Sequence, residues 1–345
     1  MPATPRYIYV ESAVADHPRA RRMIERLPRA RVVPCRRYGE IFNRRAQDFR
    51  LQKRHPAWIL AEKTAGWVLP APEEYGLGGD ENYYFSHMLN CFYDCGYCFL
   101  QGMFRSAHYL CFVNYEDFMT AIDQRLEESS AERLWFFSGY DCDSLAAEEV
   151  TGFATAFLPF FAARPRAWLE LRTKSVQIEA LLASEPYENC VVAFSFTPAE
   201  VHADLERGVP GVERRLRAMV RLRERGWQIG LRFDPLIWSR DYRQRYERLC
   251  EQVFDQLEGT EVHSVSLGSF RLPKAFYSRM TRMLPGDRLL AGPLTETDGL
   301  VGYRPELEAE MLEAVGELLL ARVPGSRLHL CQPVESQVSA ITSGK

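Results

Sequence analysis

The chain has 345 residues, 46% of them hydrophobic, and a formal net charge of −3. This length suits one barrel-sized α/β domain with additional segments, and no apolar run approaches the roughly 20 residues that a membrane-spanning helix needs. The first residues form no secretory signal, and nine cysteines, an odd number, favour reduced thiols with a metal site over a disulfide framework, so we expect a soluble cytoplasmic protein.

The first part of the chain is strongly basic. Residues 1–56 contain fourteen Lys and Arg against five Asp and Glu, a local charge of +9, so the remainder carries −12. Strands are expected near 6–10 and 31–34 and a helix over 18–27, and the Pro- and Gly-rich stretch 68–80 indicates a linker. We therefore predict an N-terminal basic α/β subdomain over residues 1–80. Its charge favours either a solvated arginine-rich face or an arm that contacts nucleic-acid phosphates.

From residue 81 onward, strand-like apolar runs alternate with polar helical stretches. The expected strands are 83–89, 134–139, 168–173, 190–196, 227–234 and 262–269. The expected helices are 115–128, 144–162, 175–183, 212–225, 241–257 and 273–283. Such alternation predicts parallel strands with right-handed crossovers and helices outside. The fold class is thus α/β, a partial (β/α)6 TIM-type barrel over 81–285, with a C-terminal extension over 286–345 that ends in a helix and a strand and packs on the barrel.

A cysteine triplet follows the first of these strands. Cys91, Cys95 and Cys98 form a C-x3-C-x2-C pattern at the strand end where barrel enzymes carry their reacting groups. Soft thiolates select zinc or iron-sulfur centres, which normally take four protein ligands. Three cysteines would leave one iron of a cluster open for a small molecule. A structural zinc or another cluster is the alternative.

The triplet in this setting resembles that of the radical S-adenosylmethionine (SAM) superfamily, in which an aromatic residue at the place of Tyr97 lies against the SAM adenine. Further segments are similar to the spore photoproduct lyases, a branch whose members are sometimes called DNA repair photolyases. These segments are 82–90, 97–101, Thr173-Lys174 and Phe194-Ser195, so that the resemblance covers nearly the whole chain.

This resemblance implies a fold, cofactors and a reaction. The three cysteines would hold a 4Fe-4S cluster, SAM would fill the open iron site, and a flavodoxin or ferredoxin would supply the electron that cleaves SAM. The resulting 5′-deoxyadenosyl radical abstracts a hydrogen atom, in the lyases from a methylene-bridged thymine dimer in DNA. Lys174 and Ser195 would hold the methionine portion of SAM, since an ammonium and a hydroxyl both bind a carboxylate.

The end of the second barrel strand departs from the lyase pattern. Tyr140 stands where the lyases carry their hydrogen-donor cysteine, and Cys142 lies two positions later. Ser138-Gly139 keeps only the central glycine of the Gly-Gly-Glu stretch that binds the SAM amino group in many relatives. Cys142 is a candidate thiol donor and Tyr140 a candidate redox or substrate-contacting residue, with structural roles for both as the alternative.

Other departures concern the relay and the substrate. Phe99 has no hydroxyl where the lyases have a relay tyrosine, so a pathway through Tyr97 alone would have to suffice, or SAM would be consumed. Asp234, at the end of the fifth strand, is a candidate contact for the SAM adenosine or a turn cap. Residues 290–300 are acidic where the lyases carry a basic, aromatic hairpin that enters DNA. Phosphate contacts would then come from the N-terminal arm or from Arg271, Lys274, Arg279 and Arg282.

The functional prediction is a radical SAM enzyme of this lyase-like group that acts on a pyrimidine dimer lesion or another nucleobase substrate. Its first alternative is a radical SAM enzyme that modifies a small molecule or peptide unrelated to DNA. The second is a non-catalytic iron-sulfur protein that binds nucleic acid. No membrane partner is expected, and the oligomeric state is not determined by the sequence.

Overall fold

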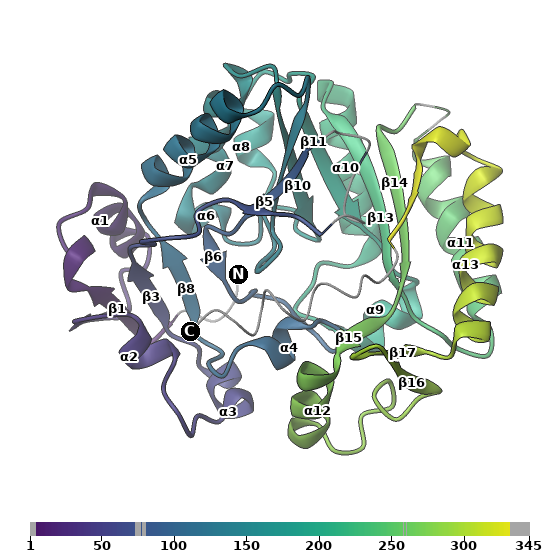
Figure 1. Cartoon of the computed structure of the whole chain (residues 1–345), viewed down its shortest axis with the longest axis horizontal. Coiled ribbons are helices and arrows are strands. Elements are labelled where there is room, and N and C mark those ends of the chain that lie inside the picture. Colours follow the sequence, from purple (N-terminus) through teal and green to yellow (C-terminus); the bar gives the residue numbers. More distant parts are fainter. Residues whose placement is uncertain (1–4, 73–76, 78–80, 258, 260, 332–345) are drawn as a thin grey trace.

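A small sheet and a large sheet form the framework of the protein (Figure 1). The computed structural model describes residues 5–72, 77, 81–257, 259 and 261–331. The small sheet has the strand order β2-β1-β3-β8-β6. Its strands are β1 (Tyr7–Glu11), β2 (Arg31–Cys35), β3 (Trp58–Ala61), β6 (Met88–Leu89) and β8 (Tyr109–Phe112). Helices α1 (Pro18–Glu25), α2 (Gly39–Phe42) and α3 (Phe49–Arg54) belong to the same part of the chain.

The large sheet confirms the predicted partial barrel. Its order is β18-β14-β13-β11-β10-β9-β5-β4, and all neighbours except the β4 and β5 pair are parallel. The strands are β4 (Leu69–Pro70), β5 (Glu81–Phe85), β9 (Leu134–Ser138), β10 (Ala167–Thr173), β11 (Cys190–Ser195), β13 (Gln228–Leu236), β14 (Ser264–Ser269) and β18 (Leu328–Leu330). Five of the six central strands are expected ones, and the sixth, β5, covers only the first part of the expected strand 83–89. The six lie side by side in chain order because each is joined to the next by a crossover.

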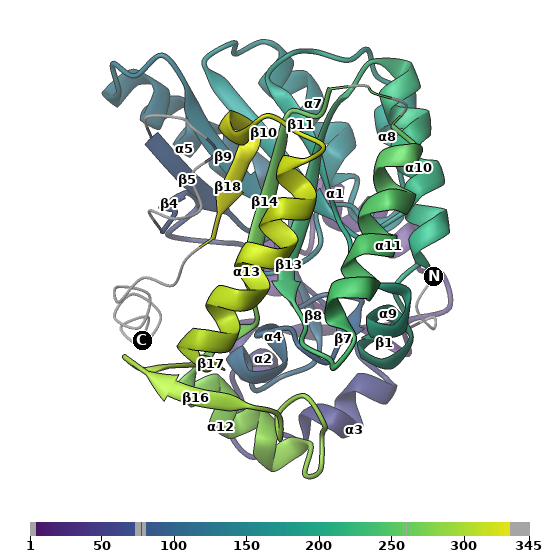
Figure 2. The same cartoon turned by 90° about the vertical axis from the view of Figure 1, so that its right-hand side faces the viewer.

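Helices cover the outer face of this curved sheet, as Figures 1 and 2 show. They are α5 (Tyr115–Glu128), α7 (Phe153–Ala162), α8 (Glu179–Leu182), α10 (Val212–Arg225), α11 (Tyr242–Asp255) and α13 (Pro305–Leu320). Much of the core between helices and sheet is aromatic: Phe85 of β5 lies 5.3 Å from Phe157 of α7, ring to ring. The inner face of the sheet carries Trp135, Phe137 and Trp168 together with charged side chains such as Glu170 and Arg232, and the site lies on this face.

The expected first strand, 83–89, is wrong as one element. β5 ends at Phe85, and β6 pairs antiparallel with β8 in the small sheet. Between them the Ser86 hydroxyl donates to Asp141 at 2.6 Å, and the His87 ring stacks on Phe153 at 3.8 Å. These two buried contacts turn the chain from one sheet into the other, so the cysteine triplet follows β6 and not a barrel strand.

Two expected helices are also shorter than predicted. The stretch 144–162 is divided into α6 (Glu148–Thr151) and α7 by Gly152, whose φ of 61° is outside the helical region. Of 175–183 only α8 is helical, because Thr173, Ser175 and their side-chain hydrogen bonds hold a turn before it. The helices over 115–128 and 212–225 are confirmed at both ends.

A three-stranded sheet follows the barrel strands. β15 (Arg271–Pro273) pairs with β17 (Leu300–Tyr303), which pairs with β16 (Leu294–Thr297), and α12 (Lys274–Met283) lies between β15 and β16 in the chain. The expected acidic loop is therefore a hairpin, with Asp298 and Gly299 at positive φ in its turn. It remains acidic, and Lys274 pairs with its Glu296 at 2.8 Å.

The small sheet combines β1 to β3 with β6 and β8 from beyond residue 80, so it crosses the expected boundary between subdomain and barrel. In the C-terminal part, β18 joins the barrel sheet through β14. The division into 1–80, 81–285 and 286–345 stays a prediction. Among the described residues, no helix has the length and apolarity to cross a lipid bilayer.

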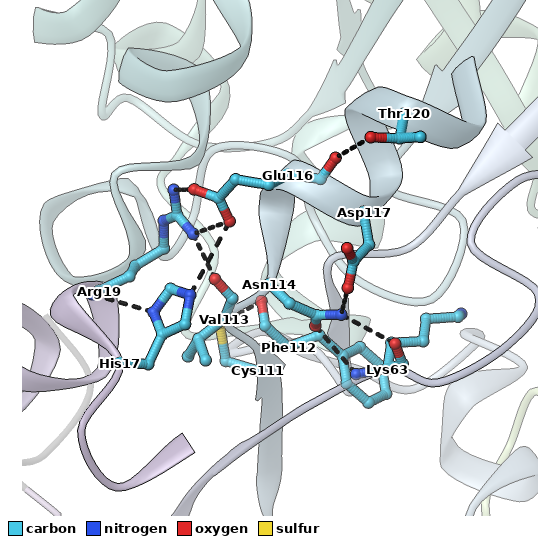
Figure 3. A network of polar contacts seen from close by, with 10 residues as sticks. All are labelled: His17, Arg19, Lys63, Cys111, Phe112, Val113, Asn114, Glu116, Asp117 and Thr120. Carbon is cyan, nitrogen blue, oxygen red and sulfur yellow. Dashed lines mark hydrogen bonds and ion pairs between the residues drawn. The ribbon is translucent and has the colours of Figure 1, made fainter. Parts of the chain in front are cut away.

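Part of the N-terminal positive charge stabilises the fold (Figure 3). Arg19 of α1 donates to the Val113 carbonyl and to both oxygens of Glu116, at 2.8 and 3.1 Å, and its guanidinium lies 4.0 Å from the centre of the Tyr115 ring. Figure 3 also shows Asn114 between Lys63 and Asp117. These contacts join α1 to the start of α5, so this arginine is a packing residue and not part of a free arm.

Candidate active site

The three cysteines of the triplet line one cavity of about 230 Å³ at the carboxyl ends of the barrel strands. Cys95 lies on β7 (Asp94–Cys95), which pairs antiparallel with β12 (Glu206–Arg207) at the end of α9 (Ala199–Leu205). The Gly96 amide donates to the Leu205 carbonyl at 2.7 Å. After Cys98 the chain enters α4 (Leu100–Met103). We call residues 91–98 the cysteine loop.

Two cations of α3 hold the cysteine loop from the N-terminal side. Arg50 contacts both oxygens of Asp94, at 3.1 and 3.2 Å. The Lys53 ammonium donates to the carbonyls of Cys91 and Tyr93, at 3.1 and 3.4 Å. From the sequence we predicted either a solvated face or a phosphate-binding arm for this basic region. Arg50 and Lys53 belong to neither, because both contact the cysteine loop. They place positive charge beside the cysteine thiols.

The arrangement of the cysteine loop is compatible with an iron-sulfur cluster. No group of three His, Cys, Asp or Glu side chains in the described part of the chain converges on one ion. In a four-iron cluster each cysteine binds a different iron, so the sulfurs need not converge. Burial raises the pKa of the Cys91 thiol to about 12, and bound iron would supply the positive charge that a thiolate needs there.

Tyr97 is held by a buried ion pair that the sequence did not indicate. Its hydroxyl donates to Glu206, which also accepts from Arg215 at 2.8 Å and contacts His202 at 3.0 Å. Burial by itself would raise the pKa of Glu206, but the hydrogen bond with His202 and the charge of Arg215 lower it to about 2. The Tyr97 ring is therefore fixed at the cavity wall, with the Lys174 ammonium 5.6 Å from its centre.

The strand end of β9 brings four predicted residues to the cavity. Gly139 has a φ of 84°, and a Cβ there would lie 2.6 Å from the Ser144 hydroxyl, so only glycine fits. The Ser138 hydroxyl lies 2.9 Å from the Glu170 carbonyl and 2.8 Å from the Ser144 hydroxyl. Ser138 therefore hydrogen bonds within the fold, and its expected contact with SAM stays a prediction.

Tyr140 and Cys142 both line this cavity. The Tyr140 ring lies between Tyr84 and Phe99, at ring distances of 4.6 and 5.5 Å. Cys142 is 6% exposed and also packs against the small core beneath the N-terminal sheet. Their positions in the chain therefore do not decide which of the two is the hydrogen donor, because both side chains line the same cavity.

Lys174, Ser195 and Asp234 complete the predicted set at the ends of β10, β11 and β13. The Lys174 amide donates to Asp143 at 2.6 Å, and the Thr173 hydroxyl donates to the same carboxylate at 2.7 Å. Asp143 also accepts from two backbone amides of its own turn, and so ties the end of β10 to the turn after β9.

All eleven predicted site residues therefore meet in one cavity. They are Cys91, Cys95, Tyr97, Cys98, Ser138, Gly139, Tyr140, Cys142, Lys174, Ser195 and Asp234. Their individual roles stay predictions. Sequence analysis missed Glu206, Arg215 and Arg172. Arg172 could have been found, because charged residues at alternate positions of an otherwise apolar strand lie on one face of the sheet. No sequence pattern indicated Glu206 or Arg215.

Comparison with known proteins supports one family. The family model "Spore photoproduct lyase" matches residues 80–284, more than half of the chain. Spore photoproduct lyase of Geobacillus sp. (strain Y412MC61) is 23% identical over 177 residues, which are 51% of this chain and 52% of that protein. The enzyme of Clostridium acetobutylicum is 20% identical over 209 residues, 60% and 62%. The chain thus spans about half to three fifths of the length of these curated relatives.

A solved spore photoproduct lyase variant, with bound AdoMet and dinucleoside spore photoproduct, has the same fold. Its TM-score is 0.83 at 17% identity, covering 97% of this chain and 100% of that one. This likeness confirms the partial barrel of the radical SAM type. The matched region, 80–284, contains the cysteine loop and every predicted site residue. The chain belongs to the spore photoproduct lyase family.

Proposed function

We propose that this chain is a radical SAM enzyme that cleaves a spore-photoproduct-type thymine dimer in DNA. The observation that carries the proposal is the meeting of the cysteine loop with the ends of β9, β10, β11 and β13 in one cavity. In barrel enzymes this end of the strands carries the chemistry. Membership of the family supports the same activity, and a solved relative holds AdoMet and a dinucleoside spore photoproduct.

The residues around the cavity match the two cofactors. Cys91, Cys95 and Cys98 would hold a 4Fe-4S cluster, and Lys174 with Ser195 would bind the methionine portion of SAM. When bound, these groups supply reductive cleavage of SAM and abstraction of a hydrogen atom from the substrate. A flavodoxin or ferredoxin as electron donor, and a cytoplasmic location, belong to the same proposal.

The protein itself positions the groups around the cavity and restricts the entry of water and unwanted hydrogen donors. Glu206 accepts from the Tyr97 hydroxyl, Arg50 pairs with the Asp94 carboxylate, and Lys53 donates to backbone carbonyls of the cysteine loop. Aromatic and aliphatic side chains line part of the cavity, which limits the access of water and unwanted hydrogen donors to a radical. They are Phe99, Leu100, Phe137, Phe270, Phe276 and Leu300.

A second candidate is a radical SAM reaction on a small molecule or peptide. The acidic hairpin favours it, because Glu296 and Asp298 stand where a basic surface would attract DNA. Lys274 is paired with Glu296, and Arg279 donates to the Gly102 and Met103 carbonyls, so two of the expected phosphate contacts serve the fold. A non-catalytic iron-sulfur protein would not need Lys174 and Ser195 in the cavity.

The first prediction separates these candidates. Anaerobically reconstituted protein, incubated with SAM, a reductant and a dinucleotide spore photoproduct, should release thymidylyl-thymidine and should also cleave SAM. Chromatography of both products is the measurement. Formation of 5′-deoxyadenosine without repaired dinucleotide would reject the repair activity and leave the second candidate. Absence of SAM cleavage from protein that holds four irons would favour the non-catalytic alternative.

The second prediction concerns the hydrogen donor. Cys142→Ala should leave SAM cleavage intact and divert the product radical to side products, because the thiol that returns the hydrogen atom is lost. Tyr140→Phe tests the competing donor by removing only the hydroxyl. Product distribution by mass spectrometry is the measurement, and solvent deuterium incorporation adds a second. Unchanged products from Cys142→Ala would remove Cys142 from the mechanism.

A further inference from the structure

The inner face of the barrel carries charged side chains in layers. Along β10, Glu170 and Arg172 face the same side because strand residues alternate, and Lys174 continues the row just beyond the strand. Along β13, Arg232 and Asp234 do the same. In the lowest layer Glu170 and Arg232 are both fully buried and lie 2.7 Å apart.

The next layer faces the cavity, where Arg172 contacts Glu170 of the lower layer at 3.0 Å and Arg271 donates to the Ser269 carbonyl at 2.9 Å. Arg172 and Arg271 approach the two oxygens of Asp234, at 4.0 and 3.9 Å, and all three residues line the cavity. Two guanidinium groups therefore share one carboxylate at the outer limit of an ion pair. Together with the lower layer, Lys174 and Asp143, this part of the barrel holds four cations and three carboxylates. The cations are Arg172, Arg232, Arg271 and Lys174, and the carboxylates are Glu170, Asp234 and Asp143. Among the charged residues that line the cavity, Arg172, Arg271 and Lys174 outnumber Asp143 and Asp234.

Two glycines make room for this arrangement. A Cβ at Gly268 would lie 2.9 Å from an Asp234 oxygen and 3.1 Å from an Arg271 nitrogen. Gly302 of β17 pairs with Arg271 of β15, and a Cβ there would lie 3.1 Å from the Phe270 carbonyl and 3.5 Å from the Arg271 Cβ. A side chain at Gly268 would therefore displace the Asp234 carboxylate and crowd the Arg271 guanidinium, whereas one at Gly302 would crowd the Phe270 carbonyl next to Arg271.

We propose that Arg172 and Arg271 form an anion subsite that binds the phosphodiester joining the two nucleosides of the substrate. This inference rests on the proposed function and names the part of the substrate that the two arginines recognise. Planar guanidinium groups match phosphate oxygens through paired hydrogen bonds. Lys174 lies on the other side, toward Tyr97 and the cysteine loop, and is assigned to SAM. In this arrangement the sugar-phosphate backbone of the substrate is recognised at the mouth of the cavity and not by the hairpin.

The experiment compares substrates that differ only at the bridge. A dinucleotide spore photoproduct carries the phosphodiester, its methylphosphonate analogue carries a neutral bridge, and the dinucleoside form has none. For the wild type we expect a KM for the phosphodiester that is about tenfold or more below that for the other two, since hydrogen bonds to charged groups are the strong ones. Arg172→Gln and Arg271→Gln should each shrink this ratio, and the double variant should bring it close to one.

The control is Arg214→Gln, which removes the same charge from an exposed position on α10, a helix on the outer face of the barrel, and should leave the ratio unchanged. The subsite is overturned if the wild type shows equal KM values for the charged and neutral bridges, a result that needs no variant to fold. It is also overturned if the arginine variants raise both KM values in parallel. If no substrate is repaired, the proposed function fails, and equilibrium binding of undamaged thymidylyl-thymidine against its methylphosphonate analogue still tests the subsite alone.

Discussion

Cys95→Ala is expected to abolish iron binding and, with it, SAM cleavage. Cys95 is 6% exposed on β7 and is one of three thiols that the cysteine loop presents to the cavity. Because the loop provides only three ligands, the loss of one leaves two, which do not retain a four-iron cluster. Iron content after anaerobic reconstitution and the yield of 5′-deoxyadenosine are the measurements. We expect both to fall to background.

A matched control separates ligand loss from the loss of any buried thiol. Cys250 is fully buried on α11 and does not line the cavity, so Cys250→Ala should keep its iron and its SAM cleavage with only a small loss of stability. A Cys95→Ala protein with the full iron content would contradict the assignment of the triplet. Cys142 would then be the next ligand to test, because it lines the same cavity.

Glu170→Gln should destabilise the folded protein by about 3–5 kcal/mol. The Glu170 carboxylate contacts Arg232 through two nitrogens, at 2.7 and 3.3 Å, and Arg172 at 3.0 Å. The amide leaves the Arg232 guanidinium buried without its counter-charge, which is the costly situation inside a protein. Urea unfolding of the apo protein, followed by circular dichroism, measures the change.

The double variant Glu170→Met with Arg232→Met is the control, because it removes both charges and fills similar space. Replacement of a buried pair by apolar residues is often close to neutral, so the double variant should recover most of the lost stability. If Glu170→Gln alone costs less than about 1 kcal/mol, the pair is not held as tightly as its geometry indicates.

The same carboxyl predicts how stability changes with pH. Burial by itself would raise the pKa of Glu170, but the charges of Arg232 and Arg172 lower it to about 2 in the folded protein, against about 4.3 in an unfolded chain. Its contribution is therefore complete above about pH 4.3 and is lost as the pH falls toward 2. Glu170→Gln should show a weaker loss of stability over that interval than the wild type.

The barrel was predictable because its strands are short apolar runs separated by amphipathic helices. β9, β10, β11, β13 and β14 lie within two residues of their predicted ends. The failures have local causes. Residues 83–89 are apolar and aromatic except for Ser86 and His87, and nothing in the local sequence indicates that these two are anchored by Asp141 and Phe153, far along the chain.

The membership of the site was predicted from the cysteine spacing, from the strand order and from the resemblance to the spore photoproduct lyases, and the assignment of Lys174 and Ser195 to SAM came from that resemblance. The cysteine spacing and the residues after β9, β10, β11 and β13 therefore pointed to one cavity, and they meet there. The residues that hold this site were not predictable. Tyr97 depends on Glu206, and Cys91 on Lys53, through contacts between segments that are distant in sequence.

Local composition thus specified the elements, their order and the chemistry of the cysteine loop. The tertiary structure decided which charged groups contact one another. Arg50 and Lys53 contact the cysteine loop, and Arg19 joins α1 to the start of α5. Arg172 and Arg271 both approach Asp234 in the cavity. The physical reason is that apolar periodicity is a local property of a chain. The partner of a charged side chain depends on distances across the sheet, and those exist only once the strands are packed.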